Sequence, residues 1–536
     1  MPVPSGPDHG PSSRLCGVLL HPTALPGTPC CGTFGMAARQ WIDQLAAAGI
    51  AAWQLLPLAP TDGTGSPYSS PSGFALNPWF LDADELVDEG FLEPVDLETL
   101  PSGSFERLDL EASRLRAAAL GERLLKRWSA QSLERQQAFA RWRREEDGWL
   151  RDHCRFMVLR ERQGQQPWWT WPRSLARRGR LALRQLDREA CGLLLQEALI
   201  QWQLQRQWHQ LRQHASARGV RLIGDLPFYV AHDSADVWAN RRLFSVRADG
   251  SLTEQSGVPP DYFSDTGQLW GTPVYRWNLH RLTGFRWWMS RLERQLQLLD
   301  LLRLDHFRAL ESYWSVAGQA ETAQEGCWRP SPGVALLATL KARWQRQQGG
   351  GSSSSASGSA SALPLIAEDL GVITPEVEAL RDRFALPGMK ILQFAFDGND
   401  DNPYLPANYL GDHWVVYTGT HDNATCLGWW RNLEEDQRRQ VGELVGHTID
   451  APGWQLLELA LGSSAQLAVV PLQDLLHLDD QARFNTPGTA SGNWTWRLSQ
   501  PIASLKDPLH GLQGLAQRYG RTGGPAVAEA VAGGSR

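Results

Sequence analysis

The amino-acid sequence predicts an α/β fold, an interrupted (β/α)8 TIM barrel with helical insertions at the C-terminal face of the barrel. Three observations support this prediction. Eight short apolar runs of strand length recur along the chain, helix-length amphipathic stretches separate several of them, and most of the runs end in polar or charged residues. In a barrel of this kind the active site is built at the carboxyl ends of the strands.

The predicted strands lie at residues 17–21, 52–58, 221–230, 301–307, 363–370, 389–396, 413–422 and 466–475. Between the first two, residues 36–48 carry Ala37, Trp41 and Leu45 at helical spacing and stop at Gly49, which predicts a helix. Residues 375–384 predict another helix, which begins with Thr374-Pro375. A doubly wound open sheet would give a similar alternation, but no glycine-rich phosphate loop follows any of the strands.

Several segments interrupt the alternation of strands and helices. Residues 1–79 start the barrel with two strands, and residues 80–217 lack strand alternation and predict a helical subdomain inserted between strands two and three. Residues 218–515 complete the predicted barrel and include an active-site loop insertion at 241–278, rich in Gly, Pro and aromatic residues. The Gly/Ser-rich run 349–362 predicts a flexible loop, and residues 516–536 are predicted to be a disordered tail.

The composition argues against several functional classes. The 536 residues carry a formal net charge of −6, which disfavours a protein that wraps nucleic acid or lies on an anionic membrane. Glu and Asp are interspersed in the Arg-dense segment 141–180, so a solvated helix face is favoured there over a nucleic-acid patch. The seven cysteines are scattered and form no C-x-x-C pair, which predicts neither a zinc site nor a disulfide framework.

We expect a cytoplasmic protein with reduced cysteines. The N-terminal segment lacks the basic start and apolar core of a signal peptide. No apolar run approaches the roughly 20 residues that a membrane helix requires.

The clearest chemical signal is the segment LLRLDHF at residues 301–307. Side chains alternate along a strand, so Arg303 and Asp305 point to the same side, where the guanidinium favours the charged form of the carboxylate. An ionised carboxylate at a strand end is what a covalent nucleophile needs, although a buried structural ion pair would have the same pattern. In the next strand, Glu368 leaves an apolar run, and its partial desolvation suits it to hold a proton.

Acidic residues at four strand ends are expected to converge on one mouth of the barrel, and these are Asp225, Asp305, Glu368 and Asp422. Two carboxyl groups facing one bond are typical of glycoside chemistry, with Asp305 as nucleophile and Glu368 as acid/base. A metal-dependent hydrolase that uses His306 and His421 is the main alternative. No paired-histidine motif such as H-x-H or H-E-x-x-H occurs at these strands, so we predict no metal and no cofactor.

The sequence also resembles the 4-α-glucanotransferase family (amylomaltase or disproportionating enzyme) of the α-amylase-like clan. The resemblance extends from GVLLHPTALPG at residue 17 to FNTPGTASGNWTWR ending at residue 497. Between them, in the same order, lie the motifs WQLLPLAPT, SPYSS, GDLPFYVAHDSADVW, PPDYFSDTGQLWG, LLRLDHFRALESYW, AEDLGVITPEV and YTGTHDN.

The resemblance implies roles for individual residues. It implies Asp305 as nucleophile, Glu368 as general acid/base and Asp422 as a third carboxylate that binds sugar hydroxyls. The substrate-binding residues that it implies are Arg303, Asp225, His421, Tyr68, Asn485 and Pro487, together with Tyr262, Phe263, Asp265 and Trp270 in a cleft-covering loop at 259–271. The chain departs from the family pattern at Ala424, Thr272 and Ala309, which affects no predicted catalytic group.

The resemblance implies a retaining transfer of α-1,4-glucan segments from a donor to the 4-hydroxyl of glucose or of another glucan. The expected partners are maltooligosaccharides and amylose-like chains as donors and glucose as acceptor, with no nucleic acid and no membrane. An α-glucan hydrolase that uses the same carboxylates is the alternative. A catalytically inactive glucan-binding protein is disfavoured because all three acidic residues are present.

Overall fold

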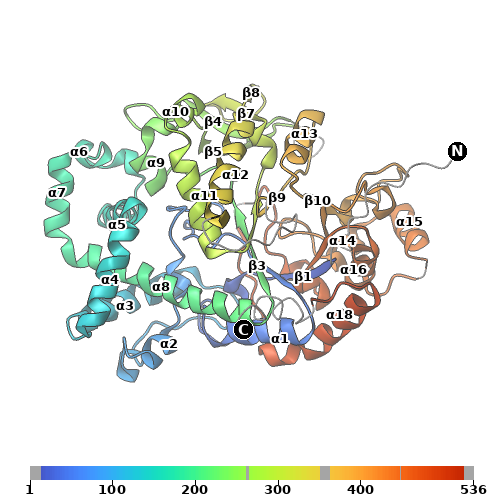
Figure 1. Cartoon of the computed structure of the whole chain (residues 1–536), viewed down its shortest axis with the longest axis horizontal. Helices are drawn as coiled ribbons and strands as arrows, with labels where there is room; N and C mark the ends of the chain where they lie inside the picture. Colours follow the sequence, from blue (N-terminus) through green and yellow to red (C-terminus); the bar gives the residue numbers. More distant parts are fainter. Residues whose placement is uncertain (1–13, 261–264, 350–361, 447, 490, 524–536) are drawn as a thin grey trace.

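The computed structural model describes residues 14–523, apart from 261–264, 350–361, 447 and 490. Its central element is a parallel eight-stranded sheet in the order β10-β11-β12-β1-β2-β3-β6-β9 (Figure 1). The bounds of these strands are β1 Leu15–Leu19, β2 Ala52–Gln54, β3 Arg221–Leu226, β6 Leu301–Leu304, β9 Leu365–Ala367, β10 Gly388–Ile391, β11 Trp414–Tyr417 and β12 Leu467–Pro471. Each lies within or overlaps one of the eight predicted runs, so the predicted fold class is confirmed.

The barrel is closed between β9 and β10, the two strands at the ends of that order. The Ala367 N–H donates to the Pro387 carbonyl at 2.9 Å. Two residues after Ala367, Asp369 accepts the Met389 N–H at 2.7 Å and forms an ion pair with Arg381 at 2.6 Å. A buried carboxylate thus ties β9 to β10 at the point where backbone pairing is sparse.

Helices cover the outside of the barrel and form the insertion after β2. The bounds are α1 Met36–Ala47, α2 Ala83–Asp88, α3 Leu110–Trp128, α4 Leu133–Glu145, α5 Asp147–Arg162, α6 Arg173–Ala176, α7 Arg180–Glu189 and α8 Cys191–Ala217, then α9 Ala235–Ala239, α10 Trp277–Leu282, α11 Arg286–Leu298, α12 Gly333–Gly349, α13 Pro375–Arg383, α14 Cys426–Asn432, α15 Glu435–Val445, α16 Pro452–Gly462, α17 Leu472–Leu475 and α18 Lys506–Arg518. The predicted helices at 36–48 and 375–384 correspond to α1 and α13.

Helix α8 belongs to both the insertion and the barrel wall. Its N-terminal part packs on α3, α4, α5 and α7, and its C-terminal part packs on α1 and leads into β3. Trp208 donates its indole N–H to the Leu298 carbonyl at 2.9 Å, and His214 pairs with Asp43 of α1 at 2.9 Å. The second half of α8 is therefore the barrel's own crossover helix, whereas the predicted subdomain placed all of it in the insertion.

A second sheet, not predicted from the sequence, stands above the carboxyl ends of the barrel strands. It is antiparallel, in the order β5-β4-β7-β8, with bounds β4 Glu254–Val258, β5 Gln268–Pro273, β7 Ser312–Ala317 and β8 Gly326–Pro330. The predicted loop insertion at 241–278 contributes β4 and β5. These strands are short, carry Gly and Pro and are partly exposed, so they lack the apolar runs of the barrel strands.

The predicted tail begins too early. Helix α18 continues to Arg518, and the Arg521 side chain is fully buried, donating to the Leu461 carbonyl at 2.6 Å and to the Ser463 carbonyl at 2.8 Å. Residues 516–523 are therefore part of the fold, and residues 524–536 lie outside the described part of the chain.

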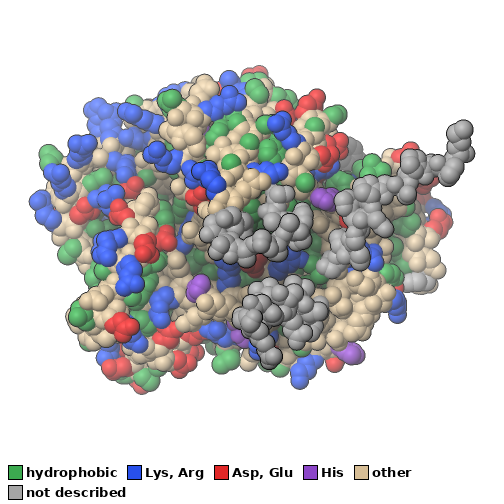
Figure 2. Space-filling view, in the orientation of Figure 1, with side chains coloured by type: hydrophobic (Ala, Val, Ile, Leu, Met, Phe, Trp, Pro, Cys, Tyr) green, Lys and Arg blue, Asp and Glu red, His purple; other side chains and the backbone are tan. Residues whose placement is uncertain are grey.

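The Arg-rich helices α5 to α7 carry paired charges. On the left of the face in Figure 2, blue and red side chains lie close together. Arg155 pairs with Asp187 at 2.5 Å, Arg178 with Asp152 at 2.8 Å, and Arg151 with Asp147 at 3.2 Å. In these ion pairs, arginines of the segment bind acidic residues of the protein itself.

In the part of the chain that the structure describes, no helix is long and apolar enough to cross a membrane.

Candidate active site

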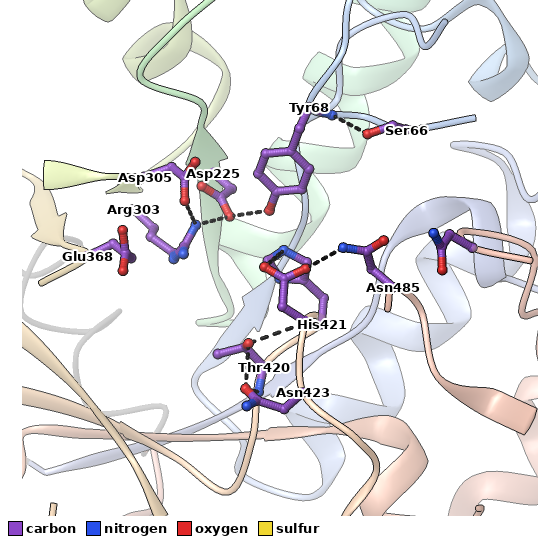
Figure 3. A network of polar contacts seen from close by, with 12 residues as sticks. Ser66, Tyr68, Asp225, Arg303, Asp305, Glu368, Thr420, His421, Asn423 and Asn485 are labelled. Carbon is purple, nitrogen blue, oxygen red and sulfur yellow. Dashed lines mark hydrogen bonds and ion pairs between the residues drawn. The ribbon is translucent and has the colours of Figure 1, made fainter. Parts of the chain in front are cut away.

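Arg303 lies at the centre of the candidate site, between two carboxylates. Its Nη1 atom lies 2.6 Å from Asp225 Oδ2 and 3.0 Å from Asp305 Oδ1 (Figure 3). The contact with Asp225 follows from the strand register, because β3 and β6 place Asp225 directly opposite Arg303. Burial acts to lower the pKa of Arg303, but Asp225 and Asp305 raise it well above its ordinary value.

The two carboxylates beside Arg303 differ in exposure. The Asp225 side chain is fully buried and also accepts the Tyr68 hydroxyl at 2.8 Å, whereas the Asp305 side chain is 30% exposed. Asp225 therefore has the character of a structural ion-pair partner. Asp305 is the carboxylate of this pair that an incoming group can reach.

Glu368 follows β9. It is linked to the turn after β6, which carries Asp305 and His306, by a backbone hydrogen bond. His306 has a left-handed backbone (φ 50°), and its N–H donates to Glu368 Oε2 at 2.6 Å. The Leu370 N–H donates to Oε1 at 3.1 Å. Burial raises the pKa of Glu368 to about 8; Arg303 opposes this rise and Asp305 adds to it. Desolvation therefore favours the protonated form of Glu368.

Asp422 is the third carboxylate and follows β11. Burial alone would raise its pKa, but His421, the hydrogen bond from Asn485 and the charge of Arg303 hold the pKa well below its ordinary value. Asn485 donates to Asp422 Oδ1 at 2.6 Å, and His421 Nε2 lies 3.2 Å from Oδ2. Asp422 is therefore ionised across the physiological range, in contrast to Glu368.

Aromatic rings fix the side of the site formed by His421. The Tyr68 ring stacks on His421 with centroids 5.1 Å apart and an interplanar angle of 12°. Trp494 is buried and lies against both rings, with centroid separations of 5.8 Å from Tyr68 and 6.0 Å from His421. Trp494 therefore supports Tyr68 and His421 through these ring contacts.

The second sheet brings Trp270 to the site. Trp270 in β5 is 38% exposed, and its ring meets the His306 ring edge-on at 4.8 Å. Asp265 is exposed at the base of the same loop, and its carbonyl accepts the Gln324 side-chain N–H at 3.0 Å. Tyr262 and Phe263 lie outside the described residues. Pro487 is exposed, two residues beyond Asn485.

Two residues at the site were not singled out from the sequence. Asp474, in α17 directly after β12, accepts the Thr418 hydroxyl at 2.8 Å and the Cys426 N–H at 2.7 Å, and so anchors both ends of the segment that carries Asp422. Arg483 donates to the Asp422 carbonyl and, at 2.6 Å, to the Asn485 carbonyl. Asp474 could have been found from the sequence, because it is an acidic residue at the end of the eighth apolar run. Arg483 lies in a loop, where no sequence pattern pointed to the site.

Two departures from the family pattern lie close to this site. The Ala424 carbonyl accepts the Gln393 side-chain N–H at 2.9 Å, and the Thr272 hydroxyl lies 2.5 Å from that of Ser256. Within residues 14–523, masked positions apart, no cluster of three or more His, Cys, Asp or Glu side chains is placed to hold a metal ion.

Comparison with known proteins gives consistent matches over most of the chain. A family model described as 4-alpha-glucanotransferase matches residues 20–503. The 4-alpha-glucanotransferase of Synechocystis sp. is 43% identical over 516 residues, 95% of this chain and 98% of that protein. That of Thermus thermophilus is 43% identical over 505 residues, 93% of this chain and 97% of that protein. The solved structure of amylomaltase from Streptococcus agalactiae in complex with acarbose has a TM-score of 0.88 and 32% identity, covering 95% of this chain and 100% of that one.

Proposed function

The chain belongs to the 4-alpha-glucanotransferase family, and on that premise we propose that Asp305, Glu368 and Asp422 divide the chemistry of glucan transfer among them. The activity is the transfer of an α-1,4-glucan segment from a donor to the 4-hydroxyl of glucose or of another α-1,4-glucan. The observation that carries the assignment is the contrast between two neighbouring carboxyl groups. The Asp305 carboxylate lies 3.0 Å from the guanidinium of Arg303, whereas Glu368 accepts backbone N–H groups from His306 and Leu370 and has a pKa raised to about 8.

In the first step Glu368 protonates the glycosidic oxygen while Asp305 attacks the anomeric carbon. The bond to the leaving sugar breaks, and a covalent glucosyl-Asp305 intermediate forms with inversion at the anomeric carbon. Positive charge develops on the sugar ring in the transition state. Asp422, kept ionised by His421 and Asn485, is suited to stabilise that charge and to bind ring hydroxyls.

The second step requires Glu368 to change from acid to base. Esterification of Asp305 removes a negative charge that raises the pKa of Glu368, whereas Arg303, which lowers it, remains. The pKa of Glu368 therefore falls when the intermediate forms, and the carboxylate can take the proton of the incoming 4-hydroxyl. Attack by that hydroxyl rebuilds the α-1,4 bond and releases Asp305.

Incubation with purified maltotriose tests transfer against the hydrolase alternative. Transfer gives glucose and a series of longer oligosaccharides while the total of reducing ends stays constant. Hydrolysis uses the same carboxylates but raises the reducing ends steadily. A steady rise without longer products would contradict transfer as the main activity.

We also propose a cytoplasmic location. All seven cysteines lie in the described part of the chain as free thiols, and five of them are buried. This is the state expected in a reducing compartment. Fractionation of cells that express the full chain, with detection of the protein in the soluble cytoplasmic fraction, tests this proposal.

A further inference from the structure

Asp369 follows Glu368 directly, and both of its carboxylate oxygens are held. Its side chain is only 4% exposed. Oδ2 accepts the Nη1–H of Arg381 in α13 at 2.6 Å, and Oδ1 accepts the Met389 N–H of β10 at 2.7 Å. Hydrogen bonds to an ionised group are shorter and stronger than those between neutral groups. The chain that carries Glu368 is therefore fixed at the next residue, where β9 meets β10 and α13 (Figure 1).

The surroundings of Asp369 leave room for its carboxylate and keep its cation in place. Gly388 begins β10, and a Cβ atom there would lie 2.5 Å from Asp369 Oδ2, so a larger residue would displace the carboxylate. The guanidinium carbon of Arg381 lies 4.6 Å from the centroid of the Trp414 ring, and Lys390 Nζ lies 4.1 Å from it. Cations are attracted to the face of an indole ring. Trp414 therefore helps to hold Arg381 beside Asp369.

Met389 connects Asp369 to Arg303. Its N–H is bound by Asp369, and its Sδ atom accepts the Nε–H of Arg303 at 3.4 Å. The Nη1 atom of the same guanidinium lies beside Asp225 and Asp305. A thioether is a weak acceptor, but Met389 is only 1% exposed, so solvent does not compete for this contact. The thioether therefore fixes the guanidinium from the side opposite to its carboxylates.

The ion pair with Arg381 favours the ionised form of Asp369. Burial raises the pKa of Asp369, whereas the Met389 N–H, Arg381 and the charge of Lys390 lower it. Arg381 is in direct contact with the carboxylate, and an adjacent cation favours the charged form of an acid. A fixed negative charge therefore lies one residue from Glu368.

The charge of Asp369 acts on the ionisation of Glu368. The other charged or titratable side chains that act on Glu368 are Arg303 and Asp305 on the β6 side and Tyr404 after β10. Burial has the largest effect and raises the pKa of Glu368; Arg303 lowers it, and Asp305 and Asp369 raise it. Burial also raises the pKa of Tyr404 to about 12, so this phenol stays neutral. Asp369 therefore helps Glu368 to retain the proton that the first step uses.

We propose that Asp369 is a positioning residue for glucan transfer. It fixes the chain beside the acid/base Glu368 and, through Met389, the guanidinium of Arg303 that lies against the nucleophile Asp305. Asp369 itself is buried away from the substrate. The inference rests on the proposed roles of Glu368 and Asp305, and adds a buried group that sets their relative position.

Asp369→Asn tests this role in the full chain with maltotriose as substrate. The amide keeps the size of the side chain but has no charge and only one acceptor oxygen. We expect kcat to fall by about 10- to 100-fold while KM stays within about twofold. The basic limb of the pH profile of kcat/KM should also move to lower pH by at least about 0.5 unit, because a negative charge beside Glu368 is lost. The charge of Arg381 that is left without its partner acts in the same direction.

Asp382→Asn is the matched control. Asp382 lies 2.9 Å from the same arginine, but its side chain is 65% exposed and contacts neither Met389 nor Glu368 in the hydrogen bonds of the described residues. It should therefore change neither kcat nor the position of the basic limb. A residue that only closes the barrel would lower the thermal midpoint without moving that limb, so the pH profile separates positioning from general stability.

Met389→Leu tests the connection to Arg303 and keeps the test open if Asp369→Asn does not fold. Leu has nearly the same volume as Met, and the backbone N–H that Asp369 accepts remains. We expect kcat per folded protein, with folding measured by circular dichroism, to fall by about three- to tenfold because Arg303 loses the partner of its Nε–H.

A folded Asp369→Asn protein with wild-type kcat and an unmoved basic limb would overturn the proposal, and so would wild-type kcat in Met389→Leu. Failure of the proposed function has a different signature. In that case the wild-type chain itself forms no longer oligosaccharides from maltotriose, whatever residue 369 is.

Discussion

Replacing Glu368 by Gln should abolish transfer and, at the same time, make the protein more resistant to unfolding as the pH rises. The carboxyl group has a pKa of about 8 in the folded chain and an ordinary value of 4.5. Between those two values the folded protein binds a proton that the unfolded chain has lost. The stability of the wild-type chain therefore falls with rising pH across this window, and a neutral side chain at position 368 escapes that loss.

The size of the effect follows from the two pKa values. Each pKa unit corresponds to about 1.36 kcal/mol, so the interval from 4.5 to about 8 corresponds to roughly 5 kcal/mol. Glu368 also accepts two backbone N–H groups, from His306 and Leu370, and the amide of Gln offers only one acceptor oxygen. The lost bond costs about 1–3 kcal/mol at every pH, so only the pH dependence isolates the ionisation.

Urea unfolding of both proteins at about pH 5 and about pH 8 measures this difference. We expect the free energy of unfolding of Glu368→Gln, relative to wild type, to rise by several kcal/mol between these pH values. Glu376→Gln is the control, since Glu376 is exposed and its hydrogen bond with Thr374 lowers its pKa. Parallel pH dependences for wild type and Glu368→Gln would refute the assignment of Glu368 as a proton donor at neutral pH.

Three further substitutions test the remaining parts of the site. Asp305→Asn should lower the transfer rate by at least about 10³-fold with an unchanged thermal midpoint, and a loss of less than about tenfold would exclude covalent catalysis by Asp305. Tyr68→Phe removes the hydroxyl bonded to Asp225 but keeps the ring on His421, so kcat/KM should fall by about 10- to 100-fold, and Tyr68→Ala should lose more. Wild-type activity of Tyr68→Phe would contradict a role for the hydroxyl, and equal losses in the two variants would contradict a role for the ring. Asp474→Asn replaces one of the two oxygens that accept from Thr418 and Cys426 by an NH2 group, so kcat should fall with KM nearly constant, whereas the exposed Asp507→Asn should change neither. A changed KM with normal kcat would contradict positioning of Asp422.

The barrel strands could be predicted from the sequence because burial on both faces produces a local signal. Strand β12 is buried at every position, and its run of apolar residues is visible in the sequence without knowledge of its neighbours. Strands β4 and β5 are stabilised by their partners in the second sheet, with Gly and Pro among their residues. Strand β4 lies between β5 and β7, and β7 is distant in the sequence, so no local pattern revealed this sheet.

The candidate carboxylates could also be identified from local sequence patterns, but the different chemical roles of the individual carboxylates could not. Alternation along one strand places Arg303 and Asp305 on the same side, and from this pattern a catalytic pair and a structural pair are indistinguishable. The register between β3 and β6 adds a third group that the pattern of one strand cannot show, because it sets Asp225 opposite Arg303 with its side chain completely buried. Arg303 lies 2.6 Å from Oδ2 of this buried carboxylate and 3.0 Å from Asp305, which remains partly exposed. Register in a barrel is set by the pairing of all its strands, so this distinction required the folded chain.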